Sequence, residues 1–144
     1  MGMIRLGNKP PLTVATGDTV VQAARAIAER NVGAAVVVEG DAVVGVITER
    51  DVLRKIVAAG RDPGATLVRE IMNSPALSIG VQTSVEDAAA LMRKHHIRHL
   101  VVTDAAGKLV GMVALRYLLY ELMDDMQRNV GDLVGYIMTD GPGG

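Results

Sequence analysis

Thr48 and Asp51 are the two residues whose types and spacing most directly indicate chemistry in this chain. They follow the apolar run 43–47, which is typical of a buried strand, and the sequence after Thr48 is compatible with a first helical turn. Such a turn directs a hydroxyl, a carboxylate and unpaired backbone N–H groups beyond the edge of a sheet. The positive end of the helix dipole also lies there, so the pattern predicts a site for an anion.

Hydrophobic periodicity and turn residues predict the elements that must position this turn. The order predicted for the first half of the chain is strand, helix, strand, strand, helix. The segments are a strand at 12–15, a helix from Thr19 to Gly33, strands at 34–38 and 43–47, and a helix from Glu49 to about Ala59. The two later strands are separated by Glu39-Gly40-Asp41, which indicates a hairpin.

The same order of elements returns in the second half. The segments are a strand at 77–79, a helix from Ser84, strands at 100–103 and 109–113, and a helix from Leu115. Val85 follows Val20 by 65 residues, and after the second hairpin Gly111 follows Gly45 by 66. Identity at a nearly fixed offset indicates an internal duplication. Because there are only two copies, we expect a pseudo-symmetric pair that shares one core.

The duplication bears on the alternative that Thr48 and Asp51 are only structural. A Thr at the N-cap and an acid in the first turn stabilise many helices without binding anything. The second copy has Ala114 and Tyr117 at the corresponding positions and is still predicted to begin a helix. The architecture therefore does not require the cap, which favours a binding function for the polar pair.

The composition limits the classes of function. The 144 residues are 49% hydrophobic with a formal net charge of −1, which fits an ordinary globular domain and disfavours sequence-independent binding of nucleic acid. Cysteine is absent, so disulfides, thiolate ligands and a cysteine nucleophile are excluded. No apolar run approaches the ~18 residues of a membrane span, and no signal-peptide pattern is visible. We therefore expect a cytoplasmic protein with no membrane partner.

The two tandem units, the first of which ends in Gly45-x-x-Thr48-x-x-Asp51, resemble a pair of CBS domains, the Bateman module. The resemblance runs from about Asn8 to Met123 and rests chiefly on segment 44–53, Val-Gly-Val-Ile-Thr-Glu-Arg-Asp-Val-Leu. Segment 71–75 resembles the lead-in to a repeat, and Ile137-Met138-Thr139 repeats it. The resemblance implies an α+β fold in which two β-α-β-β-α repeats pack about a pseudo-twofold axis. We assign 8–66 to repeat 1, 72–128 to repeat 2 and 129–144 to a C-terminal tail.

The resemblance also implies a ligand. Family members bind adenosine-containing molecules between the repeats, so AMP is favoured here, with ADP, ATP and S-adenosylmethionine as alternatives. The implied nucleotide-binding residues are Thr48, Arg50, Asp51, Ala76, Leu77, Ser78, Ile97, Arg98 and His99. Asp51 would accept the ribose hydroxyls, Thr48 and the amides after it would bind phosphate, and Arg98 would hold phosphate oxygens. Leu77 and Ile97 would enclose the adenine.

A second cleft, related to the first by the pseudo-twofold axis, is expected to be degenerate. The residues assigned to it are Leu12, Thr13, Gly33, Ala34, Ala114 and Tyr117. It has no carboxylate for a ribose, and a tyrosine ring fills space. We therefore expect one ligand per chain.

Metal binding and catalysis are weaker interpretations. His95 and His99 are four residues apart and, with His96, suggest a metal site, but the stretch crosses a helix end and no further ligand is nearby. The chain has no Gly-x-Ser-x-Gly elbow and no phosphate-binding Gly-x4-Gly-Lys loop. No pair of carboxylates is placed by a motif for acid–base chemistry, so we do not expect an enzyme.

The expected function is a regulatory module that binds one adenine nucleotide and transmits its occupancy to an unidentified partner protein. Family members commonly form homodimers through their helices. The apolar residues that could serve such a dimer, or equally an internal core, are Tyr117, Leu118, Leu119, Leu122, Met123 and Met126. The alternatives are a dimerisation scaffold without a ligand and a histidine-based metal-binding protein.

Overall fold

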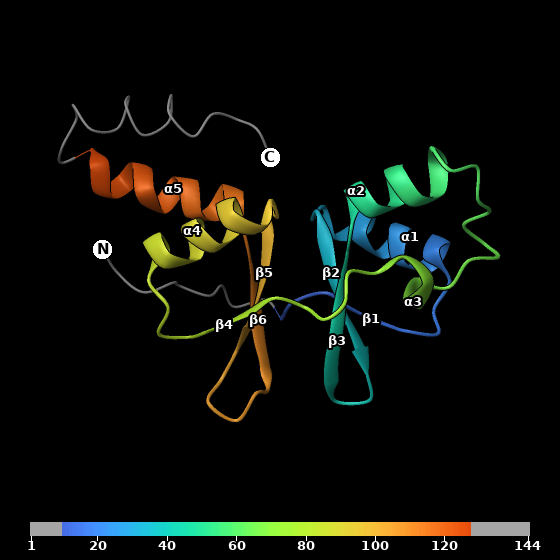
Figure 1. Cartoon of the computed structure of the whole chain (residues 1–144), viewed down its shortest axis with the longest axis horizontal. Helices are drawn as coiled ribbons and strands as arrows, with labels where there is room; N and C mark the ends of the chain where they lie inside the picture. The colour runs from blue at the N-terminus through green and yellow to red at the C-terminus, as the bar shows by residue number, and fades with distance from the viewer. Residues whose placement is uncertain (1–9, 128–144) are drawn as a thin grey trace.

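The computed structural model describes residues 10–127, which form two similar halves, each with one three-stranded sheet (Figure 1). The first half contains β1 (Thr13–Ala15), α1 (Val20–Arg30), β2 (Ala34–Glu39), β3 (Ala42–Thr48), α2 (Glu49–Val52), η1 (Leu53–Val57) and α3 (Val68–Ile71). The second half contains β4 (Ser78–Gly80), α4 (Val85–His95), β5 (His99–Thr103), β6 (Leu109–Ala114) and α5 (Leu115–Met126). This order confirms the predicted α+β class and the duplication.

The two sheets have the same topology. Their strand orders are β1-β2-β3 and β4-β5-β6. In each sheet the first strand is parallel to the second, across a helical connection, and the second pairs with the third in an antiparallel hairpin. The turn of the first hairpin includes Gly40 at φ 63°, a left-handed conformation that favours glycine. Both predicted hairpins are therefore present.

The central strands are buried on both faces, which explains their continuous β-branched composition. On β2, Ala35 and Val37 pack with the helices of their own half, whereas Ala34 and Val36 contact the other half. Val101 of β5 joins the same shared cluster. The alternation of side chains along a strand thus builds one core within each half and a third core between the halves.

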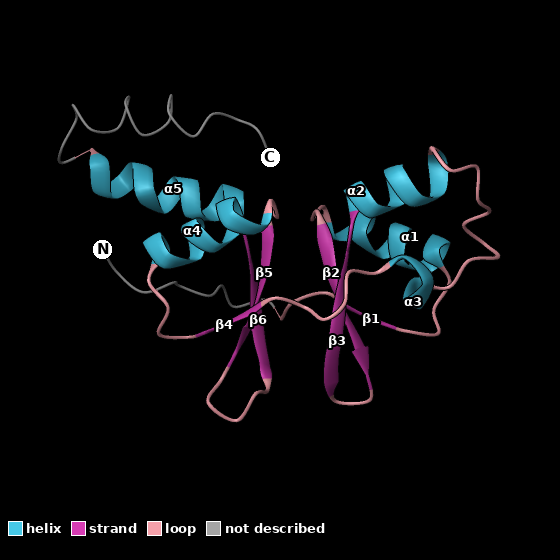
Figure 2. Ribbon diagram, viewed as in Figure 1, coloured by secondary structure: helices cyan, strands magenta, loops and turns pink. Residues whose placement is uncertain are grey.

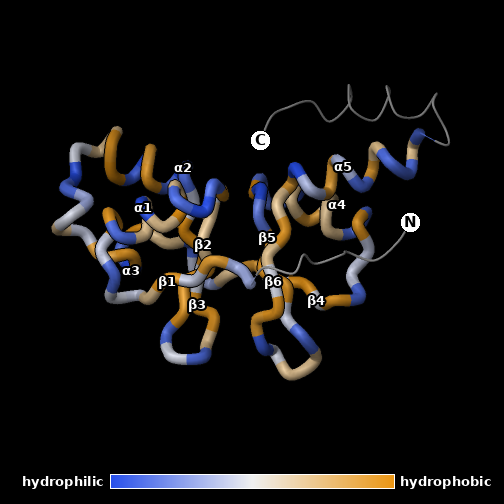
Figure 3. The backbone as a smooth tube through the Cα atoms, turned by 180° about the vertical axis from the view of Figure 1, so that it is seen from behind, coloured by the Kyte–Doolittle hydropathy of each residue, from blue (hydrophilic) through white to orange (hydrophobic). Residues whose placement is uncertain are grey.

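The helices lie on the outer sides of the paired sheets. Figure 2 shows the strands of both halves at the centre, with α1, α2 and α3 beside one sheet and α4 and α5 beside the other. In Figure 3 the hydrophobic colouring covers much of the central strands, whereas the helices show both hydrophobic and hydrophilic turns. Within the described range 10–127, no helix is both long enough and apolar enough to cross a bilayer.

The first residues of the helices agree with the sequence predictions better than the last residues do. Thr19 and Ser84, where two helices were predicted to begin, cap α1 and α4 through their side chains. The first helix ends at Arg30, with Asn31 in the left-handed conformation at φ 53°, and so does not extend to Gly33 as expected. Asn can adopt this conformation and terminate a helix in place of glycine.

The helix expected from Glu49 to Ala59 has a different form. It begins as α2, a short α-helix, and continues as η1, where the wider π-helical turn brings Ala58 N–H to the Leu53 carbonyl at 2.8 Å. The short helix α3 was not predicted. The tail at 129–144, including its Ile137-Met138-Thr139 segment, lies outside the described residues.

Candidate functional site

Thr48 and Asp51 form a reciprocal capping box where β3 meets α2. Thr48 Oγ1 accepts from the Asp51 amide at 3.1 Å, and Asp51 Oδ2 accepts from the Thr48 amide at 2.9 Å and from its hydroxyl at 3.0 Å. The Glu49 amide donates to the Gly33 carbonyl at 3.0 Å. Three amides of the turn therefore already have partners inside the protein. This corrects the expectation that the amides after Thr48 are unpaired and available to an anion, because those of Glu49 and Asp51 both donate within the protein.

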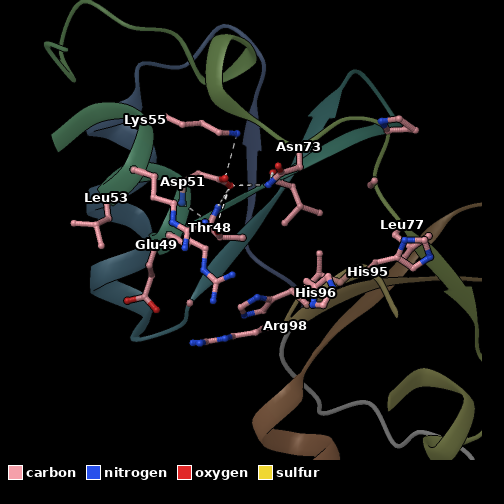
Figure 4. Close-up of a pocket in the computed structure, with 18 residues that line it drawn as sticks. Thr48, Glu49, Asp51, Leu53, Lys55, Asn73, Leu77, His95, His96 and Arg98 are labelled. Atoms are coloured by element: carbon pink, nitrogen blue, oxygen red, sulfur yellow. Dashed lines mark hydrogen bonds and ion pairs between the residues drawn. The ribbon is translucent and has the colours of Figure 1, made fainter. Parts of the chain in front are cut away.

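Two further side chains converge on the same carboxylate (Figure 4). Asn73 donates from Nδ2 to Asp51 Oδ2 at 2.8 Å, and Lys55 Nζ lies 3.3 Å from Asp51 Oδ1. Asp51 is only 6% exposed, so its oxygens depend on these protein donors for hydrogen bonds that water would otherwise supply. The carboxylate is therefore held in one orientation between the cap, the linker and the next turn of helix.

Asn73 reaches Asp51 because the linker between the halves is attached to β3. Val46 and Asn73 exchange two backbone hydrogen bonds of 3.0 and 2.9 Å, and the Ser74 hydroxyl donates to the Val44 carbonyl at 2.7 Å. A side chain at Gly45 would bring its Cβ within 2.6 Å of the Asn73 carbonyl oxygen and 3.0 Å of Met72 Sδ. Glycine at 45 thus permits the close approach that delivers Asn73 to the carboxylate.

The carboxylate lines a cavity of about 890 Å³ whose walls come from both halves. The side chains on the repeat 1 wall include the cations Arg50, Arg54 and Lys55. The opposite wall includes Arg98, the neighbouring Ile97 and apolar groups from the linker. The lining residues carry four cations against the two acids Glu49 and Asp51, so the cavity favours an anionic ligand.

Most of the residues predicted for the nucleotide site are brought together. The lining includes Thr48, Arg50, Asp51, Ala76, Leu77, Ile97, Arg98 and His99. Ser78 does not line the cavity, because it is the exposed first residue of β4, where its backbone pairs with Val101. Leu77 and Ile97 are half-buried on the wall facing Asp51 and pack on the core of their own half.

Sequence reasoning missed several lining residues, of which Lys55 and Asn73 contact Asp51 directly. The others are Val46, Glu49, Leu53, Arg54, Pro75, His95 and His96, together with Gly33, which was assigned elsewhere. Lys55 is four residues after Asp51, and that spacing places two side chains on one helix face. Asn73 had no comparable local signal, because the linker reaches the site only through its pairing with β3.

The residues assigned to the second cleft do not all lie where they were expected. Gly33 lines the first cavity: its carbonyl accepts from the Glu49 amide, and a Cβ added there would lie 3.1 Å from His99 Nε2. The remaining residues are outside that cavity: Ala34 is buried between the halves, Leu12 packs on the first core, Thr13 is exposed on β1, and Ala114 ends β6 at the N-cap position of α5. Tyr117 packs partly buried on the second core.

The three histidines have different environments. His99 is largely buried against Gly33, and this burial, with a smaller contribution from the Arg98 charge, lowers its pKa to about 4. His99 is therefore neutral at pH 7 and can offer a hydrogen bond but no charge to a ligand. His95 and His96 are exposed at the end of α4. Among the residues that the structure describes, no group of three His, Cys, Asp or Glu side chains could hold a metal ion.

Comparison with known proteins places these features in a family. The family model described as "CBS domain" matches residues 4–58 and 68–124. The chain is 42% identical to the CBS domain-containing protein YhcV of Bacillus subtilis over 103 residues, which are 72% of each protein. It is 34% identical over 123 residues to the protein MK0525 of Methanopyrus kandleri. That match covers 83% of this chain but only 63% of the relative, so the chain spans less than two thirds of that protein.

A solved structure agrees with the same family. The CBS domain protein PAE2072 from Pyrobaculum aerophilum, complexed with AMP, superposes with a TM-score of 0.73 at 32% sequence identity. The superposition covers 82% of this chain and 95% of that one. The same family is indicated by the sequence matches and by the fold, in which two equivalent three-stranded halves share a core. This chain belongs to the CBS-domain family and contains two CBS domains in tandem.

Proposed function

We propose that this protein is a regulatory module that binds an adenine nucleotide, with AMP favoured over ADP and ATP, in the cavity between its two CBS domains. The observation that carries the proposal is the Asp51 carboxylate, held by Thr48 and Asn73, facing Arg98 across a cavity of about 890 Å³. A fixed hydrogen-bond acceptor and a separate cation are what a ribose and a phosphate require. The AMP bound by the Pyrobaculum aerophilum relative supports the same class of ligand.

The nucleotide would be divided among three parts of the cavity. The ribose hydroxyls donate to Asp51, and the adenine lies between Leu77 and Ile97, the half-buried apolar pair of the opposite wall. The phosphate contacts Arg50 and Arg98, because the neighbouring amides already have partners. Side-chain cations, rather than the helix N-terminus, therefore supply the positive charge for the phosphate.

Occupancy of this cavity would be transmitted to a partner because the ligand contacts both repeats. A ligand shifts a conformational equilibrium only if it binds one arrangement more tightly than another. Contacts with Asp51 on one wall and Arg98 on the other provide such a difference, since they require a particular distance between the repeats. The module has a regulatory rather than a catalytic function in this proposal.

Exposed apolar residues support a homodimer formed through the helices. Leu53 and Val57 of η1 are 59% and 67% exposed, and Leu119 and Met123, which follow them by 66 residues, are each 38% exposed on α5. Equivalent positions of both repeats thus present apolar side chains on helices, as a symmetric interface needs. Leu118 and Leu122, which were also considered for a dimer, are buried in the core of repeat 2.

The ligand assignment can be tested by calorimetric titration of the full chain with AMP, ADP, ATP, S-adenosylmethionine and Zn²⁺. We expect AMP to bind and Asp51→Ala to abolish detectable binding. A matched control is Asp87→Ala, because Asp87 occupies the same position in the first turn of α4 without lining the cavity. A response to Zn²⁺ alone would favour the metal alternative. Dimerisation without any response would favour the scaffold.

A further inference from the structure

The Asp51 carboxylate has few acceptor positions left for a ligand. A carboxylate offers about four lone-pair positions, two on each oxygen. Oδ2 already receives three donors within 3.0 Å: the Thr48 amide, the Thr48 hydroxyl and the Asn73 amide group. An incoming hydroxyl must therefore bond to Oδ1, which faces the ammonium of Lys55.

Lys55 has a second partner that would hold it if it lost the first. Its Nζ donates to the Ile71 carbonyl at 2.8 Å, a shorter contact than the 3.3 Å to Asp51 Oδ1. The Lys55 side chain is 41% exposed, whereas that of Asp51 is 8% exposed. The ammonium can therefore leave the carboxylate for water without losing its carbonyl partner.

A ribose presents two adjacent hydroxyl donors, whereas Oδ1 has one position free while Lys55 is in contact with it. We infer that Lys55 competes with the ribose for Asp51, and that binding a complete cis-diol displaces its ammonium from Oδ1. This inference rests on the proposed function, because it assigns the ribose to Asp51. Lys55 is then a specificity-determining residue, because binding both hydroxyls requires the Lys55–Asp51 ion pair to break.

Removing Lys55 should therefore increase the affinity for a ribose, although the cavity is lined by several cations. A lysine that simply attracted phosphate would have the opposite effect. Adenosine separates the two roles, since it carries the ribose but no phosphate. Its 2′-deoxy analogue makes a further distinction, because a single hydroxyl needs only the position on Oδ1 that Lys55 leaves free.

The experiment is calorimetric titration of wild type and Lys55→Met with adenosine, 2′-deoxyadenosine and AMP. We expect adenosine to bind Lys55→Met about two- to fivefold more tightly, the range expected for loss of a partly exposed ion pair. The change for 2′-deoxyadenosine should be smaller. AMP should gain less than adenosine, because the lost charge also attracted its phosphate. Unchanged or weaker adenosine binding by Lys55→Met would overturn the inference.

Two variants guard against indirect effects. Lys94→Met removes the same charge from an exposed residue of α4 that does not line the cavity, and should leave adenosine affinity unchanged. Lys55→Gln should reproduce the gain if the packing of methionine is not its cause, and thermal unfolding without ligand identifies any variant that fails to fold. If wild type binds AMP but Lys55→Met and Lys55→Gln show no gain with adenosine, only this inference fails. If wild type binds neither AMP nor adenosine, the proposed function fails with it.

Discussion

The two repeats share a backbone but differ in the chemistry of one turn. In repeat 1 the strand–helix junction carries the Thr48–Asp51 capping box, whereas in repeat 2 the equivalent Ala114 begins α5 with no side-chain cap. The amide after each junction nevertheless makes the same bond, Glu49 to the Gly33 carbonyl at 3.0 Å and Leu115 to the Arg98 carbonyl at 2.8 Å. The backbone contact is thus enough to begin the helix, so the polar side chains of repeat 1 require another explanation.

The largest expected effect tests whether the two junctions differ in binding. Asp51→Ala should weaken AMP binding at least about 100-fold, because two hydrogen bonds to a charged acceptor contribute about 3 kcal/mol or more together. Tyr117→Ala, at the equivalent position of repeat 2, should leave affinity within about twofold. Calorimetry also gives the stoichiometry, for which we expect one AMP per chain. Two equal sites in wild type would contradict the asymmetry.

A second difference lies at His99, whose equivalent in repeat 1 is Ala34. Because the pKa of His99 is lowered from 6.5 to about 4, the unfolded chain binds its proton first as the pH falls. The contribution of neutral His99 to the free energy of unfolding is therefore fully present above pH 6.5. It is lost as the pH falls towards 4, by at most about 3 kcal/mol. Urea unfolding across this range should show a smaller pH dependence for His99→Ala than for wild type.

The exposed His95 provides the control for that experiment. His95→Ala removes an exposed imidazole from the end of α4, so the unfolding free energies of the two alanine variants are compared across the same pH range. Equal pH profiles for His99→Ala and wild type would mean that His99 is not held neutral by the fold.

The linker contact of repeat 1 should be sensitive to a single methyl group. Gly45→Ala would place a Cβ 2.6 Å from the Asn73 carbonyl oxygen, a backbone atom that can move only with the linker. We expect a loss of about 1–3 kcal/mol in unfolding free energy, together with weaker AMP binding as Asn73 shifts from Asp51. Gly17→Ala is the control, since no heavy atom outside its two chain neighbours lies within 4 Å of the added Cβ. A neutral Gly45→Ala would show that the linker does not depend on this approach.

The smallest effect is expected from a substitution that makes the two junctions more alike. Ala114→Ser supplies the missing N-cap of α5 and should raise the unfolding free energy by about 0.5–1 kcal/mol without creating a nucleotide site. Thermal unfolding and AMP titration measure the two outcomes. Ala105→Ser, in the exposed second hairpin loop, should do neither. A second bound AMP in Ala114→Ser would mean that a cap alone makes the site.

The fold could be predicted because its signals are local and repeated. The apolar runs of β2 and β5 specify central strands buried on both faces, and the nearly constant offset relates one half to the other. Thr48 and Asp51 were found for the same reason, as neighbours on a recognisable turn. The end of α1 was missed because Asn31 adopts a conformation that glycine was expected to supply.

The remainder of the site depends on tertiary contacts that no short segment encodes. Asn73 reaches Asp51 only because the linker pairs with Val46, and that pairing is visible only in the folded chain. Gly33 lies beside His99 because the two repeats approach each other there, and Ser78 is excluded because β4 turns it to the exposed side. Spacing alone identified the acid but not the groups that orient it.

The core between the halves has a consequence for how the molecule can be divided. Ala34 and Val36 of one sheet are fully buried only because the other sheet, through Val101, covers them. A single CBS domain produced alone would present this aliphatic sheet surface to water and would be expected to self-associate. Neither half therefore buries all of its apolar surface by itself, although each has its own core, and a one-copy ancestor would have covered this surface by pairing with itself.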